Sequence, residues 1–364
     1  MKKNLAIMLF SDRKYMFALG TFIINIKQFV KNYDSILIYN SDFSSEDEQN
    51  INKIDDKCIF IKYTFDDFIE EFNFDKDQIK NLDAIKRYSH ISPVKFKMFT
   101  HLNEYKTIIL FDTDMLLLSD INDILNDNYN IAWRDEQLIS EKLTRSGYSI
   151  DKIKKIGLLD TYSKATTPNG GFIIINDNFD YMLAYNTAFN YFKKYFLIHP
   201  FLMGEITLGY VRFILNLNLF PVDHNIYNAF PNMINLKTKL IHFLGNYKPW
   251  NRQFIQYIYC QWIYNYIEYT MITGHKDSQV KIFDNIGEDF ILKENNKEKW
   301  NKIFNINKFI YPSELKPRLD FEQKYFIFDY NDYLYYEILS PSWLFESYCC
   351  RMWIRGSYVC NNTI

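Results

Sequence analysis

The sequence predicts an α/β fold built on a mostly parallel central sheet. In the first half of the chain, short apolar runs alternate with segments of helical periodicity, which is typical of parallel strands connected by helices. One of these apolar runs ends in two closely spaced aspartates, at the kind of strand end where such sheets bind ligands. The chain has 364 residues and 48% hydrophobic content, enough for one large domain or one domain plus a substantial extension.

Four strands and three helices are expected in this first half. The strands are the short apolar runs at residues 5–10, 36–39, 58–63 and 107–111. The helices are the periodic segments at residues 15–32, 45–54 and 93–105. Ser45 followed by Glu48 fits a capping box, and Ser92 followed by Pro93 fits an N-cap with proline in the first helical position.

The pattern continues to about residue 250 and then changes. Residues 169–176 read as a turn entering a buried strand, residues 178–196 as a helix, and residues 239–244 as a short strand. Residues 251–364 are dense in aromatic side chains without clear alternation. We therefore expect a ligand-binding domain over residues 1–250 and an aromatic-rich, mainly helical C-terminal extension over residues 251–364. This extension would act as a cap or as a dimer contact.

Composition excludes several classes of protein. The formal net charge is −2 and the lysines are spread among acidic residues, so no nucleic-acid-binding surface is expected. Five cysteines, an odd number without zinc spacing, favour reduced thiols and a cytoplasmic location. The apolar N-terminus is read as a strand, and the uncharged segment 254–267 is too short and too polar to cross a bilayer. It is expected to be an aromatic core helix.

The two aspartates that follow the apolar run are Asp112 and Asp114. On extended backbone, side chains two residues apart point to the same side, so both carboxylates converge where the strand ends. Oxygen ligands of this kind suit a hard divalent cation such as Mg2+ or Mn2+. The alternative is an ordinary turn. Asp75 and Asp77 repeat the spacing without a preceding apolar strand and serve as the natural comparison.

A second group of candidate residues begins at His242. A lone histidine in an apolar strand is most often a hydrogen-bonded core residue. Here it is followed by Gly245, which allows a close backbone approach, and by Lys248, a mobile cation that could reach a phosphate. The alternative for Lys248 is a surface residue in the turn before Trp250.

These residues carry a family resemblance. The stretch from His242 to Trp250 resembles the His-Phe-x-Gly-x-x-Lys-Pro-Trp signature of glycogenin and its relatives in glycosyltransferase family 8. Phe-Asp-Thr-Asp at residues 111–114 resembles the metal motif of that family, and Asn-Gly-Gly at residues 169–171 resembles its Asn-Ser-Gly turn. The segments around Lys95 and at residues 9–15 also have counterparts, in family order.

The resemblance implies a GT-A, Rossmann-like fold and a metal-dependent, retaining transfer of a hexose from a UDP-sugar to a hydroxyl acceptor. Glucose is the expected sugar and Mn2+ or Mg2+ the expected cation. The acceptor would be a glycan, a protein or the chain itself, self-glucosylated on a tyrosine. Two alternatives stay open. One is a related transferase that adds another sugar, such as galactose, to a separate glycan, lipid or protein; the other is a non-catalytic UDP-sugar-binding protein.

The resemblance also assigns roles to individual residues. Asp112, Asp114 and His242 would bind the metal. Lys248, the Gly245 amide and Lys95 would contact the diphosphate, with Lys97 as the alternative to Lys95. The remaining nucleotide-sugar contacts would come from Leu9, Phe10, Ser11 and Tyr15 at the uridine, Thr113 between the aspartates, and Asn169 and Gly170 at the donor sugar.

The chain departs from the family where relatives have Gly-Asp-Gln near the reacting carbon of the sugar. This chain has Gly204, Glu205 and Ile206 at those positions. Glu205 can replace the aspartate as a carboxylate and is our candidate catalytic group, together with Lys95 and Lys248. Ile206 cannot offer an amide and is expected to form an apolar wall. The alternative is a core helix that leaves Glu205 exposed.

Overall fold

The computed structural model describes residues 2–280, except 127, 201–202, 232–233, 236, 246, 252–255 and 257–258, and the backbone of three strands between residues 325 and 355. The chain forms two compact units. The first consists of Met1–Leu19, Val30–Thr113 and Ile121–Asp223, and the second of Gly20–Phe29, Asp114–Asp120 and His224–Ile364.

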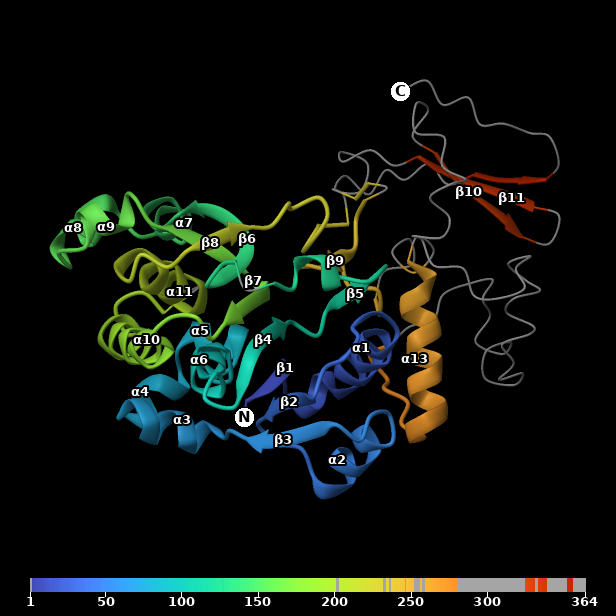
Figure 1. Ribbon diagram of the computed structural model, residues 1–364, viewed down its shortest axis with the longest axis horizontal. Coiled ribbons are helices and arrows are strands. Elements are labelled where there is room, and N and C mark those ends of the chain that lie inside the picture. The colour runs from blue at the N-terminus through green and yellow to red at the C-terminus, as the bar shows by residue number, and fades with distance from the viewer. Residues whose placement is uncertain are drawn as a thin grey trace. The chain divides into compact units, whose positions relative to one another are not determined.

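The first unit is built on a seven-stranded sheet with the order β3-β2-β1-β4-β7-β6-β8 (Figure 1). Strands β3, β2, β1 and β4 are parallel, β7 is antiparallel to both β4 and β6, and β8 pairs with β6 in parallel. The strands are β1 (Lys3–Ser11), β2 (Ser35–Asn40), β3 (Cys58–Lys62), β4 (Tyr105–Phe111), β6 (Ile131–Leu138), β7 (Thr166–Asn176) and β8 (Leu219–Pro221). The prediction of a mostly parallel sheet is confirmed.

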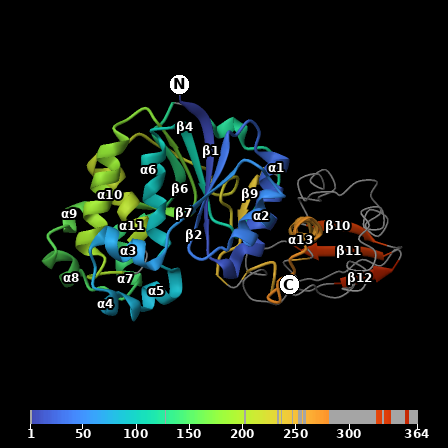
Figure 2. The same cartoon turned by 90° about the horizontal axis from the view of Figure 1, so that it is seen from below.

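Helices cover both faces of this sheet, which explains why its strands read as unbroken apolar runs. On one face, α11 (Met203–Ile214) packs against β7, and α10 (Tyr181–Tyr195) packs against α11 and α6 (Lys97–His101) (Figure 2). The opposite face carries α2 (Ser45–Asn52). All six residues of β2 are buried as a result.

Short helices fill the connections of the first unit. They are η1 (Arg13–Tyr15), α3 (Phe65–Phe72), α4 (Lys76–Lys80), α5 (Asp83–Tyr88), η2 (Ser92–Phe96), η3 (Asn122–Ile124), α7 (Ile139–Arg145), α8 (Ile150–Lys155) and α9 (Leu159–Tyr162). The predicted helix 93–105 is therefore two short helices, η2 and α6, and ends at His101.

Two predicted helix caps are off by one residue. The capping box of α2 is formed by Ser44 and Asp47, because the Ser44 hydroxyl accepts from the Asp47 amide and the Asp47 carboxylate accepts from the Ser44 amide. Ser92 is already the first residue of η2, and Ile91 precedes it as the N-cap without a side-chain hydrogen bond.

The second unit contains a small antiparallel sheet of β5 (Met115–Leu117) and β9 (Leu240–His242), in which Met115 pairs with His242. Helix α1 (Met16–Phe29) contributes residues 20–29 to this unit. Its buried Asn25 accepts from the Leu117 amide at 2.6 Å and donates to the Leu117 carbonyl at 3.1 Å. Polar groups inside α1 therefore fix the position of β5.

The aromatic core helix predicted at residues 254–267 overlaps α13 (Cys260–Thr273), which ends at Thr273 and not at residue 267. Its Trp262 and Tyr266 rings are buried and stacked with their centroids 5.7 Å apart. Beyond it, β10 (Tyr325–Tyr330), β11 (Tyr333–Ile338) and β12 (Met352–Arg355) form an antiparallel sheet that the sequence prediction did not include. The rest of residues 281–364 lies outside the described residues. The boundary near residue 250 and the cap or dimer role thus stay predictions. Within the described part of the chain, no helix combines the length and apolar character that crossing a membrane requires.

The packing of α11 on β7 depends on Gly209. A Cβ atom at this position would lie 2.3 Å from the Thr166 carbonyl oxygen, a backbone atom that cannot move aside. We predict that Gly209→Ala lowers the free energy of unfolding by about 1–3 kcal/mol. Chemical denaturation measures this change.

Gly204→Ala is the matched control on the same helix. Its Cβ would meet nothing closer than the Ser92 hydroxyl at 3.6 Å, an ordinary contact. Alanine also has the higher helix propensity, so this variant should be at least as stable as the original protein. Equal stability of both variants would contradict the close approach of α11 to β7.

Candidate metal centre

The two predicted metal aspartates lie in the turn that follows β4. The Asp112 amide donates to the Gly171 carbonyl at 2.8 Å, which continues the pairing of β4 with β7 by one residue. Thr113 then turns the chain, and Asp114 directly precedes β5. The apolar strand therefore delivers both carboxylates to one short turn.

His242 lies beside Asp114 because of the register between β5 and β9. The backbone amide of Phe243, the next residue, donates to the Asp114 carbonyl at 2.9 Å. His242 is only 2% exposed, and its Nε2 atom lies 3.2 Å from Asp114 Oδ1. Its Nδ1 atom lies 2.9 Å from Asn228 Oδ1. When Asn228 accepts from Nδ1–H, the lone pair of a neutral ring is on Nε2, facing the aspartates.

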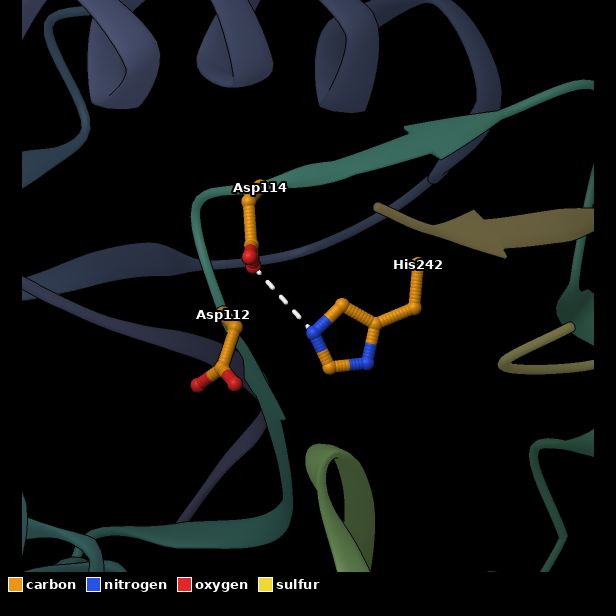
Figure 3. Close-up of side chains that lie close together, drawn as sticks. All are labelled: Asp112, Asp114 and His242. Carbon is orange, nitrogen blue, oxygen red and sulfur yellow. Dashed lines mark ion pairs between the residues drawn. The ribbon is translucent and has the colours of Figure 1, made fainter. Parts of the chain in front are cut away.

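Asp112, Asp114 and His242 together form a cluster with metal-ligand chemistry (Figure 3). Each residue offers one ligand atom, and these atoms all lie within 4.8 Å of one another. Two carboxylate oxygens and one imidazole nitrogen suit Mn2+ or Mg2+, and the Asn228 contact is the kind that orients a metal-binding histidine. The residues therefore fit the predicted cation.

Each aspartate also has a lysine partner of its own. Lys95 Nζ lies 3.1 Å from Asp112 Oδ1, and Lys248 forms an ion pair with Asp114 and donates to the Phe243 carbonyl at 2.5 Å. Burial alone raises the pKa of the Asp114 carboxyl, but the adjacent His242 ring and the Lys248 ammonium outweigh burial and hold that pKa below its ordinary range.

Of the two lysines left open by the sequence, Lys95 is the one that lies beside the aspartates. Lys95 lies in η2 and contacts Asp112, whereas Lys97 begins α6 and forms an ion pair with Glu71. The Lys97 ammonium also donates to the Tyr185 hydroxyl at 3.2 Å. Lys97 is therefore part of a separate network.

The turn at Asn169 and Gly170 lies between Lys95 and Glu205. Lys95 donates to the Gly170 carbonyl at 2.7 Å, and the Gly170 amide donates to Glu205 Oε1 at 2.9 Å. A Cβ on Gly170 would lie 2.9 Å from the Lys95 ammonium and 3.2 Å from the Glu205 side chain, so both side chains would have to shift to admit it. The alternative of an exposed Glu205 is wrong, because its side chain is 20% exposed and hydrogen-bonded.

Sequence reasoning missed three residues of this region. Lys142 in α7 forms an ion pair with Glu205, and its ammonium lies 3.3 Å from Glu136 Oε2. Asn228, the partner of His242, was also not identified. No motif surrounds these residues in the sequence. The register of β6 with β7 and the position of α11 bring Lys142 and Glu136 to their partners, and the pairing of Ala229 with β9 brings Asn228 to His242.

Other predicted residues differ in how they are placed. The side chain of Leu9 is fully buried in β1, Ser11 is buried, and the Phe10 ring lies under the Lys95 ammonium, 5.0 Å from its centroid. Tyr15 is exposed at the end of η1. Gly245 has a φ of +58°, which favours glycine.

The expectation for Ile206 is wrong. Its side chain is 1% exposed and belongs to the hydrophobic core of the first unit. It therefore packs inward from α11 and does not form an exposed apolar wall beside Glu205.

No protein-family model matches the sequence, and no curated protein matches it. Among solved structures, the bifunctional glycosyltransferase WbbM is similar with a TM-score of 0.52 and 14% identity, over 76% of this chain and 52% of that chain. The galactosyltransferase LgtC, solved with donor and acceptor sugar analogues, reaches a TM-score of 0.49 at 12% identity, over 77% of this chain and 98% of that chain. GlyE from Streptococcus pneumoniae TIGR4 reaches 0.46 at 12% identity, over 74% of this chain and 62% of that chain.

At these identities the likeness shows the fold alone. The chain spans about half the length of WbbM. The fold is GT-A, as the sequence predicts.

We predict that Asp112→Asn weakens Mn2+-supported binding of UDP by more than about 100-fold, because it removes a charged ligand from a hard cation. Titration calorimetry in the presence and absence of Mn2+ measures the effect. Asp75→Asn is the control, since Asp75 caps α4 by accepting from the Gln78 amide at 2.9 Å. Binding within a few-fold of the original protein in both variants would show that Asp112 is not a metal ligand.

We predict that Asn228→Gly weakens Mn2+ binding by about 10–100-fold through the loss of the His242 Nδ1 partner. Glycine is the suitable replacement because Asn228 has a φ of +59°. Electron paramagnetic resonance of free Mn2+ measures the affinity. An unchanged affinity would show that Asn228 does not orient a metal ligand.

Proposed function

We propose that this chain is a divalent-metal-dependent, retaining glycosyltransferase that transfers a hexose from a UDP-sugar to a hydroxyl acceptor. The observation that carries the proposal is the cluster of Asp112, Asp114 and His242 after a central strand of a GT-A fold. A lysine next to each aspartate supplies further positive charge. Together these groups suit a site for a nucleoside diphosphate.

Asp112, Asp114 and His242 would hold Mn2+ or Mg2+. When bound, the cation neutralises the negative charge of the diphosphate as the glycosidic bond breaks. Lys95 and Lys248 now compensate the two aspartates. A cation on those carboxylates would weaken both ion pairs and release the ammonium groups to bind diphosphate oxygens. Their charge would then stabilise the UDP leaving group.

The surroundings of Glu205 support transfer without a strong protein nucleophile. One of its carboxylate oxygens accepts from the Gly170 amide, and the other pairs with Lys142. A carboxylate engaged in this way is a poor nucleophile, so Glu205 would act by its fixed negative charge near the reacting carbon. The acceptor hydroxyl would attack the sugar from the same face that UDP leaves, and the site would act mainly by positioning the donor and the acceptor.

UDP-glucose with Mn2+ is the first donor to test, and the chain itself is one candidate acceptor. Incubation followed by intact-mass measurement and assay of free UDP separates the alternatives. Stepwise mass gains of one hexose mean self-glycosylation on the chain. Free UDP without a mass gain means transfer to another acceptor or to water. We expect UDP release that stops when Mn2+ is chelated and is absent from Asp114→Asn.

A panel of other UDP-hexoses, including UDP-galactose, extends the same test to the choice of sugar. Bound UDP-sugar without turnover of any donor would identify a binding protein. Absence of both turnover and UDP binding would contradict the proposed function.

A further inference from the structure

Lys142 is a buried cation shared by two carboxylates from different elements. Its side chain is 5% exposed, its ammonium pairs with Glu205 of α11, and it lies 3.3 Å from Glu136 Oε2 of β6. It also donates to the Thr167 hydroxyl of β7 at 3.3 Å. Burial lowers the pKa of Lys142, but the charges of Glu205 and Glu136 outweigh burial and raise that pKa above its ordinary value. The residue therefore stays charged at neutral pH.

The same two carboxylates hold the turn at Asn169 and Gly170. Glu136 Oε1 accepts from the Asn169 side-chain amide at 3.0 Å, and Glu205 Oε1 accepts from the Gly170 backbone amide at 2.9 Å. Each carboxylate thus uses one oxygen for the turn and the other for Lys142. The turn is held from its far side by Lys95, which donates to the Gly170 carbonyl.

Removing the positive charge of Lys142 would leave two largely buried carboxylates without the cation they share, and Glu136 would keep the more distant Arg134, whose Nε lies 4.0 Å from Glu136 Oε1. Weakly compensated charges of the same sign repel each other and favour solvent. Each carboxylate would then rotate toward water or bind a proton, and the Asn169 and Gly170 amides would lose their fixed acceptors. Asp112, Lys95 and the backbone pairing of Asp112 with Gly171 do not contact Lys142 and would stay in place.

We propose that Lys142 is a positioning residue for the sugar part of the donor. Through Glu136 and Glu205 it fixes the Asn169 side chain and the Gly170 peptide, the groups expected beside the donor hexose. This inference rests on the proposed function, and it assigns to Lys142 a role in binding the hexose and not the diphosphate. Loss of Lys142 should therefore weaken UDP-hexose binding relative to UDP.

The test compares the dissociation constants of UDP and UDP-glucose, both with Mn2+, by titration calorimetry on the full chain. In Lys142→Met, the ratio of the UDP-glucose dissociation constant to the UDP dissociation constant should rise by at least about tenfold. The reason is that the Asn169 side chain and the Gly170 peptide, once displaced, lose most of their contribution to hexose binding. UDP binding should change by less than about twofold. Lys142→Arg, which keeps the charge, should restore part of the ratio.

Lys97→Met is the matched control. Lys97 also forms a partly buried ion pair with a glutamate, but that pair lies in the separate network of Glu71 and Tyr185. This variant should lose stability without changing the ratio. Glu136→Met serves where Lys142→Met does not fold, since it removes the acceptor of the Asn169 side-chain amide and leaves the Lys142–Glu205 pair intact. It should also raise the ratio.

An unchanged ratio in folded Lys142→Met and in Glu136→Met would overturn the inference. Equal weakening of UDP and UDP-glucose binding, with a loss of thermal stability like that of Lys97→Met, would also overturn it by showing a purely structural role. Failure of the original protein to bind either ligand would instead contradict the proposed function itself.

Discussion

The compensation of carboxylate charge is the constraint on which the site depends. Asp112 and Asp114 lie at the end of a buried strand, where unpaired negative charges would strongly disfavour folding. Lys95 balances the first and Lys248 the second, and His242 Nε2 lies 3.2 Å from Asp114. The two ammonium groups are also what a diphosphate would need, and the carboxylates with the imidazole are what a divalent cation would need. The arrangement that makes the folded chain tolerate two acids therefore also prepares it for an anionic, metal-bound ligand.

The fold supplies this arrangement through strand ends and register. The buried β4 ends at Phe111, and its pairing with β7 brings Gly171 to Asp112. The pairing of β5 with β9 brings His242 to Asp114. Each functional side chain is thus fixed by backbone hydrogen bonds of its own unit. Two glycines allow close contacts because they lack a side chain. Gly170 lets Lys95 and Glu205 approach the turn, and Gly209 lets α11 approach Thr166 of β7.

The sequence predicted those features that are local. Apolar runs identified the strands, and the Asp112–Asp114 spacing and the loop after His242 are short patterns with direct chemical meaning. It left Lys95 and Lys97 open because the change from a 3-10 helix to an α-helix at that point alters which side each residue faces. Ile206 was misjudged because helical periodicity alone does not say which face of α11 meets the core. Lys142, Glu136 and Asn228 were missed because their contacts with Glu205, Asn169 and His242 depend on how separate elements pack.

Anomalous diffraction from crystals grown with Mn2+ and UDP would locate the cation directly. We expect an anomalous peak bonded to carboxylate oxygens of Asp112 and Asp114 and to His242 Nε2. We also expect Lys95 and Lys248 to turn from the aspartates toward the diphosphate. A Mn2+ peak away from these three residues, or UDP bound elsewhere with both lysine–aspartate pairs intact, would contradict the proposed metal site.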